Sequence, residues 1–90
     1  MTDVMDEVVV VNSLGMHARP AAALVQRVLN FESDIYISCN DNRVNAKSIM
    51  GLLTLGAARG SRLMVSCSGP DAVEALNAVK EIFASGFGEE

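Results

Sequence analysis

The stretch DIYISCNDNRVNA, residues 34–46, carries the clearest evidence of fold class in this 90-residue chain. Within Asp34–Asn40 apolar and polar side chains alternate, and this period of two predicts a strand with one buried side and one solvent-facing side. The buried side carries Ile35, Ile37 and Cys39, and the other side carries Tyr36 and Ser38. The Asp41-Asn42 pair suits a tight turn into a second short strand over Arg43–Ala46. Strands with one polar face indicate an antiparallel sheet covered by helices on one side only.

The rest of the chain adds two strands and three helices to this hairpin. β-branched or alternating runs predict the strands, and apolar residues at helical spacing predict the helices. The predicted strands are Glu7–Asn12 and Arg62–Ser68, and the predicted helices are Ala18–Asn30, Ser48–Leu55 (ended by Gly56) and one with Pro70 in its first position. Their inward positions are Ala21, Leu24, Val25, Val28, Leu63, Val65, Cys67, Ala72, Ala75, Leu76, Val79 and Phe83. The order βαββαβα predicts one α+β domain over residues 1–90, with four antiparallel strands under three helices.

The composition argues against several classes of partner. A formal charge of −4 is unfavourable for binding nucleic acid or an anionic membrane. The N-terminus carries acids where a secretory signal has bases, and no segment approaches the roughly 20 apolar residues of a membrane span, so we expect a cytoplasmic protein. Cys39 and Cys67 have no metal-ligand spacing, and we expect both to be buried, reduced thiols. No metal or other cofactor is predicted.

The chain's only histidine lies in LGMHARPAA, residues 14–22, immediately before a predicted helix. The first amides of a helix lack intrahelical partners and suit an anion such as phosphate, and Pro20 belongs in this first turn. The helix field favours a neutral His17 ring with one nitrogen free as a nucleophile, and Arg19 offers a planar fork of donors for phosphoryl oxygens. This set predicts a phosphoryl acceptor. The alternative is that His17 only caps the helix while Arg19 is solvated.

Two motifs resemble one known family. GMHARPAA (15–22), followed by AKSIMGLLTLGAARGS (46–61), resembles the HPr family of phosphocarriers of the phosphoenolpyruvate-dependent phosphotransferase system, over about Glu7 to Phe87. The resemblance implies an open-faced β-sandwich and a carrier rather than an enzyme. It implies that Enzyme I phosphorylates His17 on Nδ1, that the group passes to the A domain of an Enzyme II, and that Arg19 is the active-site arginine. We expect a monomer.

The branch of the system is suggested by the surface around the first helix. Sugar-branch members usually carry several lysines there, whereas this chain has Gln26, Leu29 and Gly51, with Arg27 nearby. The start NSLGMHARPA (12–21) and the end ALNAVKEIFASGFGEE (75–90) look more like members of the nitrogen branch. The resemblance therefore favours a regulatory role over sugar uptake.

Ser48 has two possible roles. As the N-cap of the short helix it would accept a hydrogen bond from a first-turn amide, which is worth about 1 kcal/mol. The resemblance adds that KSIM is similar to the site phosphorylated by HPr kinase/phosphorylase, where a phosphate would repel partners rather than unfold the domain. Both roles remain open at this point.

The short helix is apolar on nearly every side, although a helix lying on a sheet buries only one. We predict that Leu52 and Leu55 enter the core, leaving a docking patch of Ile49, Met50 and Leu53 beside His17. A more deeply sunk helix would bury all of these residues. The rival reading of the whole chain is a non-catalytic regulatory interaction or small-ligand-binding domain, because a fold of this kind does not determine activity.

Overall fold

The computed structural model describes residues 2–89, and the elements follow the predicted order βαββαβα. Met1 and Glu90, the ends of the predicted 1–90 domain, lie outside the described residues. The last helix is followed by a 3-10 turn, η1. The bounds are β1 Thr2–Val9, α1 Ala18–Val28, β2 Asp34–Cys39, β3 Asn42–Asn45, α2 Ile49–Leu55, β4 Arg62–Gly69, α3 Ala72–Ala84 and η1 Gly86–Gly88.

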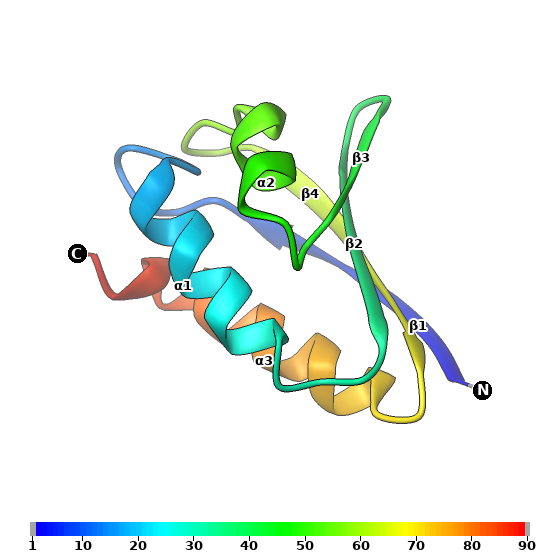
Figure 1. The fold of residues 1–90 in the computed structure, drawn as a ribbon. Helices are drawn as coiled ribbons and strands as arrows, with labels where there is room; N and C mark the ends of the chain where they lie inside the picture. Colours follow the sequence, from blue (N-terminus) through cyan, green and yellow to red (C-terminus); the bar gives the residue numbers. More distant parts are fainter. Residues whose placement is uncertain (1, 90) are drawn as a thin grey trace.

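The four strands form one antiparallel sheet in the order β1-β4-β2-β3. Among the described residues all three helices lie against the same face of this sheet (Figure 1), and no helix covers the opposite face. The predicted α+β architecture, an open-faced sandwich, is therefore confirmed. No helix within residues 2–89 has the length and apolar character that a membrane crossing requires.

The core lies between the sheet and the helices, and it is built mainly from the predicted stripes. Every predicted inward position of α1, β4 and α3 is buried, and Phe83, Leu24 and Leu63 are among the largest fully buried side chains. Ile35 and Ile37 of β2 are also buried, but Cys39 is only half-buried because it sits at the end of the strand. The prediction of two buried thiols is thus right for Cys67 and wrong for Cys39.

The first strand lies earlier in the chain than its sequence indicated. We predicted Glu7–Asn12, but β1 runs over Thr2–Val9 because it pairs with all eight residues of β4, from Thr2 opposite Gly69 to Val9 opposite Arg62. Hydrogen bonds to a long partner strand hold polar residues in the extended conformation, although these residues have little strand preference of their own. Asn12 is therefore free to leave the sheet, and it is buried at the start of the loop that leads to α1.

One predicted turn and one predicted helix start are displaced by a residue or two. The hairpin turn is Asn40-Asp41 rather than Asp41-Asn42, since Cys39 pairs with Asn42 and Asn40 adopts a positive φ of 56°. Asparagine tolerates this left-handed conformation better than most residues. Pro70 does not occupy the first position of the last helix, because Asp71 is the N-cap of α3 and its carboxylate accepts hydrogen bonds from the backbone amides of Glu32 and Ser33.

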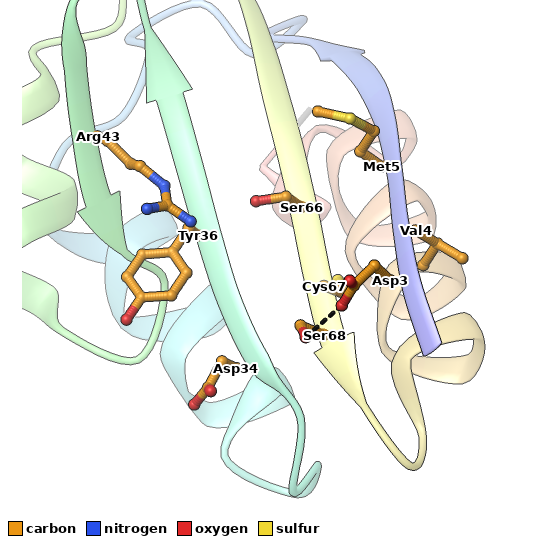
Figure 2. A pocket seen from close by; sticks show the side chains of 9 residues that line it. All are labelled: Asp3, Val4, Met5, Asp34, Tyr36, Arg43, Ser66, Cys67 and Ser68. Carbon is orange, nitrogen blue, oxygen red and sulfur yellow. Dashed lines mark hydrogen bonds between the residues drawn. The ribbon is translucent and has the colours of Figure 1, made fainter. Parts of the chain in front are cut away.

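The uncovered face of the sheet has a shallow hollow of about 360 Å³ (Figure 2). The guanidinium of Arg43 stacks over the Tyr36 ring at 4.1 Å from its centroid, and Ser68 donates a hydrogen bond to Asp3. None of the predicted site residues is among those that line it. The lining residues are Asp3, Val4, Met5, Asp34, Tyr36, Arg43, Ser66, Cys67 and Ser68.

Candidate functional site

The loop that presents His17 is held against the segment after α2. The amide of Met16 donates to the carbonyl of Ala57 at 2.8 Å, and the Met16 side chain is buried. Gly15 has φ of +69°, and a Cβ added there would lie 2.4 Å from the Ala57 oxygen. Only glycine permits both this backbone conformation and this close approach. The glycine before the histidine therefore sets the position of the imidazole.

His17 is the N-cap of α1, with extended backbone angles (φ −96°, ψ −168°). Its carbonyl accepts from Ala21, but within residues 2–89 its side chain makes no capping hydrogen bond. The part of the alternative in which the His17 side chain caps the helix is therefore wrong, whereas Arg19 is exposed to solvent as that alternative expected. The ring is 36% exposed and so accessible from solvent. Pro20 lies in the first turn, as predicted.

The helix start also carries the groups that suit an anion. The amides of Ala18 and Arg19 have no hydrogen-bond partner within residues 2–89, and the Arg19 side chain is exposed and forms no ion pair within that range. Unpaired first-turn amides and a solvent-facing guanidinium are groups that bind phosphoryl oxygens. Whether His17 and Arg19 share a phosphoryl group remains a prediction.

The sequence did not predict two further candidates, Glu89 and Asn12, because only tertiary packing brings them to His17. A carboxylate oxygen of Glu89 lies 3.0 Å from His17 Nε2, although the two residues are 72 positions apart. Asn12, which we had placed at the end of a strand, is buried and donates through Nδ2 to Glu89 at 2.9 Å and to the Gly15 carbonyl at 2.8 Å. In the sequence Asn12 follows a run of four valines and Glu89 lies far along the chain, so no local pattern indicates that these two side chains meet.

The second motif forms α2 and the surface next to it. Ser48 is the N-cap, and its Oγ accepts from the amide of Gly51 at 3.1 Å, so the capping role is confirmed. Gly56 ends the helix with a left-handed backbone, as predicted. Leu52 and Leu55 are buried. The three residues of the docking patch are exposed by 41% (Ile49), 71% (Met50) and 36% (Leu53), so the alternative of a deeply sunk helix is wrong.

The described residues offer a poor alternative nucleophile in Cys67 and no candidate metal site. Burial, with a smaller contribution from the charge of Asp71, raises the pKa of the Cys67 thiol to about 11, which keeps the thiol protonated at neutral pH. Within residues 2–89 no three His, Cys, Asp or Glu side chains are grouped in a way that could hold a metal ion.

Comparisons with known proteins identify the family of this chain. A family model described as the PTS HPr component phosphorylation site matches residues 4–85. The chain belongs to the HPr family. The phosphocarrier protein HPr of Treponema pallidum (strain Nichols) is 46% identical over 87 residues, which are 97% of this chain and 99% of that relative. The HPr of Neisseria meningitidis serogroup B (strain ATCC BAA-335 / MC58) is 40% identical over 89% of this chain and 90% of its own length.

Solved HPr structures share the fold. The crystal structure of HPr-C-His from Thermoanaerobacter tengcongensis has a TM-score of 0.89 and 41% identity, and the match covers 100% of this chain and 99% of that one. An HPr dimer from the same organism has a TM-score of 0.77 and 44% identity over 83% and 86% of the two chains. As an HPr family member, the chain is a phosphocarrier of the phosphotransferase system.

Proposed function

We propose that this chain carries a phosphoryl group on Nδ1 of His17, taking it from the phosphohistidine of Enzyme I and giving it to the A domain of an Enzyme II. The main support is an accessible imidazole at a helix start whose amides are uncapped within residues 2–89, in a chain of the HPr family. Residues 1–90 would act as one domain of this kind.

Transfer from one imidazole to another breaks one phosphorus–nitrogen bond and forms one. The Nδ1 lone pair attacks phosphorus, a new P–N bond forms, and the P–N bond to the donor imidazole breaks with its electron pair returning to the donor nitrogen. Arg19 and the amides of Ala18 and Arg19 hold the phosphoryl oxygens during both transfers. Because the same site must later release the group, it should bind phosphohistidine only moderately. The chain thus acts as a carrier, transiently modified, and not as a free-standing enzyme.

The docking patch supplies the contact with Enzyme I. Ile49, Met50 and Leu53 are exposed together on the short helix α2, which packs against α1. An apolar patch lets an acidic protein bind without clustered basic residues. We place the protein in the cytoplasm, where its two free cysteines would stay reduced, and we expect it to act as a monomer.

A regulatory branch, the nitrogen branch, is favoured over sugar uptake. Gln26 of α1 and its C-cap residue Leu29 are exposed, so the surface of this helix lacks lysines at these two positions, where acidic sugar-branch partners would meet them. Gly51 is closely packed, since a Cβ there would lie 3.2 Å from Val44 Cβ. Presenting the phosphorylated chain with A domains of both branches distinguishes them, and faster transfer to the sugar-branch domain would contradict this assignment.

Ser48 is a second, regulatory site in this proposal, and HPr kinase/phosphorylase is the enzyme that would modify it. Its Oγ lies at the start of α2, immediately before the docking patch, where a phosphate adds negative charge without disturbing the core. The chain incubated with that kinase and ATP should gain an acid-stable phosphate that Ser48→Ala cannot gain.

The decisive experiment adds Enzyme I and phosphoenolpyruvate to the purified chain. We expect one phosphoryl group per chain, labile in acid, stable in alkali, and absent in His17→Ala. Arg19→Ala should slow the transfer while the thermal unfolding midpoint stays unchanged. Arg43→Ala is the matched control, because it removes a guanidinium from the uncovered face of the sheet. If the wild type is not modified, the carrier proposal is wrong and the chain is better interpreted as a non-catalytic interaction or ligand-binding domain.

A further inference from the structure

We propose that Glu89, held in place by Asn12, is a positioning residue that selects the tautomer of His17 required for phosphoryl transfer. The inference rests on the proposed function, since it assumes that Nδ1 is the accepting nitrogen. The new element is that a carboxylate at Nε2 determines which ring nitrogen is free to react.

The argument begins with hydrogen-bond chemistry at Nε2. Both carboxylate oxygens of Glu89 lie close to this atom, Oε2 at 3.0 Å and Oε1 at 3.2 Å. An ionised carboxylate can only accept, so His17 must donate through Nε2–H. A neutral imidazole has a single N–H, which leaves the lone pair on Nδ1. The contact therefore presents Nδ1 as the nucleophile and keeps Nε2 out of the reaction.

Asn12 determines where the carboxylate sits. The Asn12 side chain is buried, with 1% exposure, and its Nδ2 donates to both Glu89 Oε1 and the carbonyl of Gly15. The opposite orientation of the amide would place Oδ1 against these two acceptors and is excluded by repulsion. One buried amide thus ties the tail segment that carries Glu89 to the loop that presents His17.

The backbone after α3 returns Glu89 to the site. The turn η1 follows α3 with positive φ at Gly86 (63°), Phe87 (59°) and Gly88 (73°), and Phe87 packs edge-on against the core residue Phe83 at 4.8 Å between ring centroids. A positive φ at a phenylalanine is unfavourable and needs compensating contacts. The aromatic contact and the Asn12–Glu89 hydrogen bond supply them. Glu89 itself is only 14% exposed.

The substitution Glu89→Gln separates tautomer selection from simple tethering. The new side chain has the same shape, and its carbonyl oxygen stays with Asn12 Nδ2, which can only donate. The amide nitrogen then replaces Oε2, at 3.0 Å from Nε2 in the wild type, and donates where the carboxylate accepted. The carbonyl oxygen at 3.2 Å from Nε2 is shared with Asn12 Nδ2, so the nearer contact is now a donor. This favours the lone pair on Nε2, and the share of the Nδ1–H tautomer should rise. An equivalent carboxylate-to-amide change beside a catalytic histidine is known to trap the wrong tautomer.

Two measurements test the proposal. Two-bond 1H–15N correlations of the labelled ring, recorded at alkaline pH, should report mainly Nε2–H in the wild type and a larger share of Nδ1–H in Glu89→Gln. Phosphorylation by Enzyme I under single-turnover conditions should slow about tenfold in Glu89→Gln, the effect of one misdirected hydrogen bond. Glu89→Ala, which neither accepts nor donates, should give a rate between the two. Glu74→Gln, an exposed position in the first turn of α3, is the control for the lost charge and should match the wild type.

The outcomes separate this inference from the proposed function. The tautomer is measured on the unphosphorylated protein, so it can be read even if Enzyme I never modifies the chain. Failure of the wild type to be phosphorylated would refute the carrier proposal and leave the tautomer test standing. An unchanged tautomer in Glu89→Gln, or a Glu89→Ala variant slower than Glu89→Gln, would refute tautomer selection and make Glu89 a structural tether.

Discussion

The close approach of Gly15 to the segment after α2 can be tested against a second glycine with nearly the same backbone. Gly15 has φ of +69° and Gly56 has φ of +59°. A Cβ at Gly15 would lie 2.4 Å from the Ala57 oxygen, whereas among the described residues nothing lies within 4 Å of a Cβ at Gly56. Alanine at either position meets the same conformational penalty, but only at Gly15 does it also collide with backbone.

The magnitudes follow from these two terms. A left-handed alanine costs about 1–2 kcal/mol, partly offset by the reduced entropy of the unfolded chain, so Gly56→Ala should lose about 1 kcal/mol. Gly15→Ala adds a collision that only backbone movement relieves, typically another 1–3 kcal/mol, for a total of about 2–4 kcal/mol. For a domain of this size 1 kcal/mol lowers the unfolding midpoint by roughly 4–8 °C. The expected losses are then about 5 °C for Gly56→Ala and 10 °C or more for Gly15→Ala.

The assay combines thermal unfolding with phosphoryl transfer. Gly15→Ala moves the loop that carries His17, so the folded variant should accept the phosphoryl group from Enzyme I more slowly at a temperature where it is fully native. Gly56→Ala meets no neighbouring atom among the described residues, so it should leave the loop in place and transfer at the wild-type rate. If Gly15→Ala were no less stable than Gly56→Ala, the close approach would not constrain the loop and the reasoning would be wrong.

Five further substitutions test the second motif and an acid-sensitive contact. Ser48→Ala should lose about 1 kcal/mol on urea unfolding, whereas Ser48→Asp keeps a capping oxygen and its stability but binds Enzyme I more weakly by calorimetry; equal affinity would count against repulsion. Leu53→Ala should weaken that binding with less than about 0.5 kcal/mol of destabilisation, while the buried Leu52→Ala should lose about 2–5 kcal/mol, and the reverse pattern would exclude the docking patch. The Ser33 hydroxyl, and then the Glu32 amide, hold the pKa of Asp71 below its usual range, which stabilises the fold above the ordinary carboxyl pKa and ceases to do so as the pH falls through the lowered value. Urea unfolding of Ser33→Ala should therefore show a deficit at neutral pH that shrinks in acid, and a deficit independent of pH would contradict this account.

Local patterns in the sequence determined most of the architecture. Alternation in β2 and β4 and the helical stripes of α1 and α3 identified the buried faces, because side-chain direction follows directly from the period of each element. The same reasoning placed Ser48 as a cap and left the docking patch exposed on α2, since a short helix on a sheet cannot bury every side. The helix start at His17 was also visible, from Pro20 and the residues around it.

Other features depended on contacts between distant parts of the chain. The extent of β1 was set by the eight-residue length of β4, because a strand continues as long as its partner offers hydrogen bonds. The turn at Asn40-Asp41 likewise follows the register of β2 and β3. No short window of sequence contains the partner strand, so local preference could not locate these ends.

The candidate site likewise contains groups that the local sequence predicts and groups that only tertiary packing brings together. The sequence by itself determined that an imidazole and an arginine stand at a helix start, since both lie within one short motif. Only the tertiary structure decided what lies at the second nitrogen of that imidazole, because Glu89 reaches it through the turn after α3 and is held there by the buried Asn12. Hydrogen bonds act over about 3 Å, and residues 72 positions apart come that close only when the whole fold has formed.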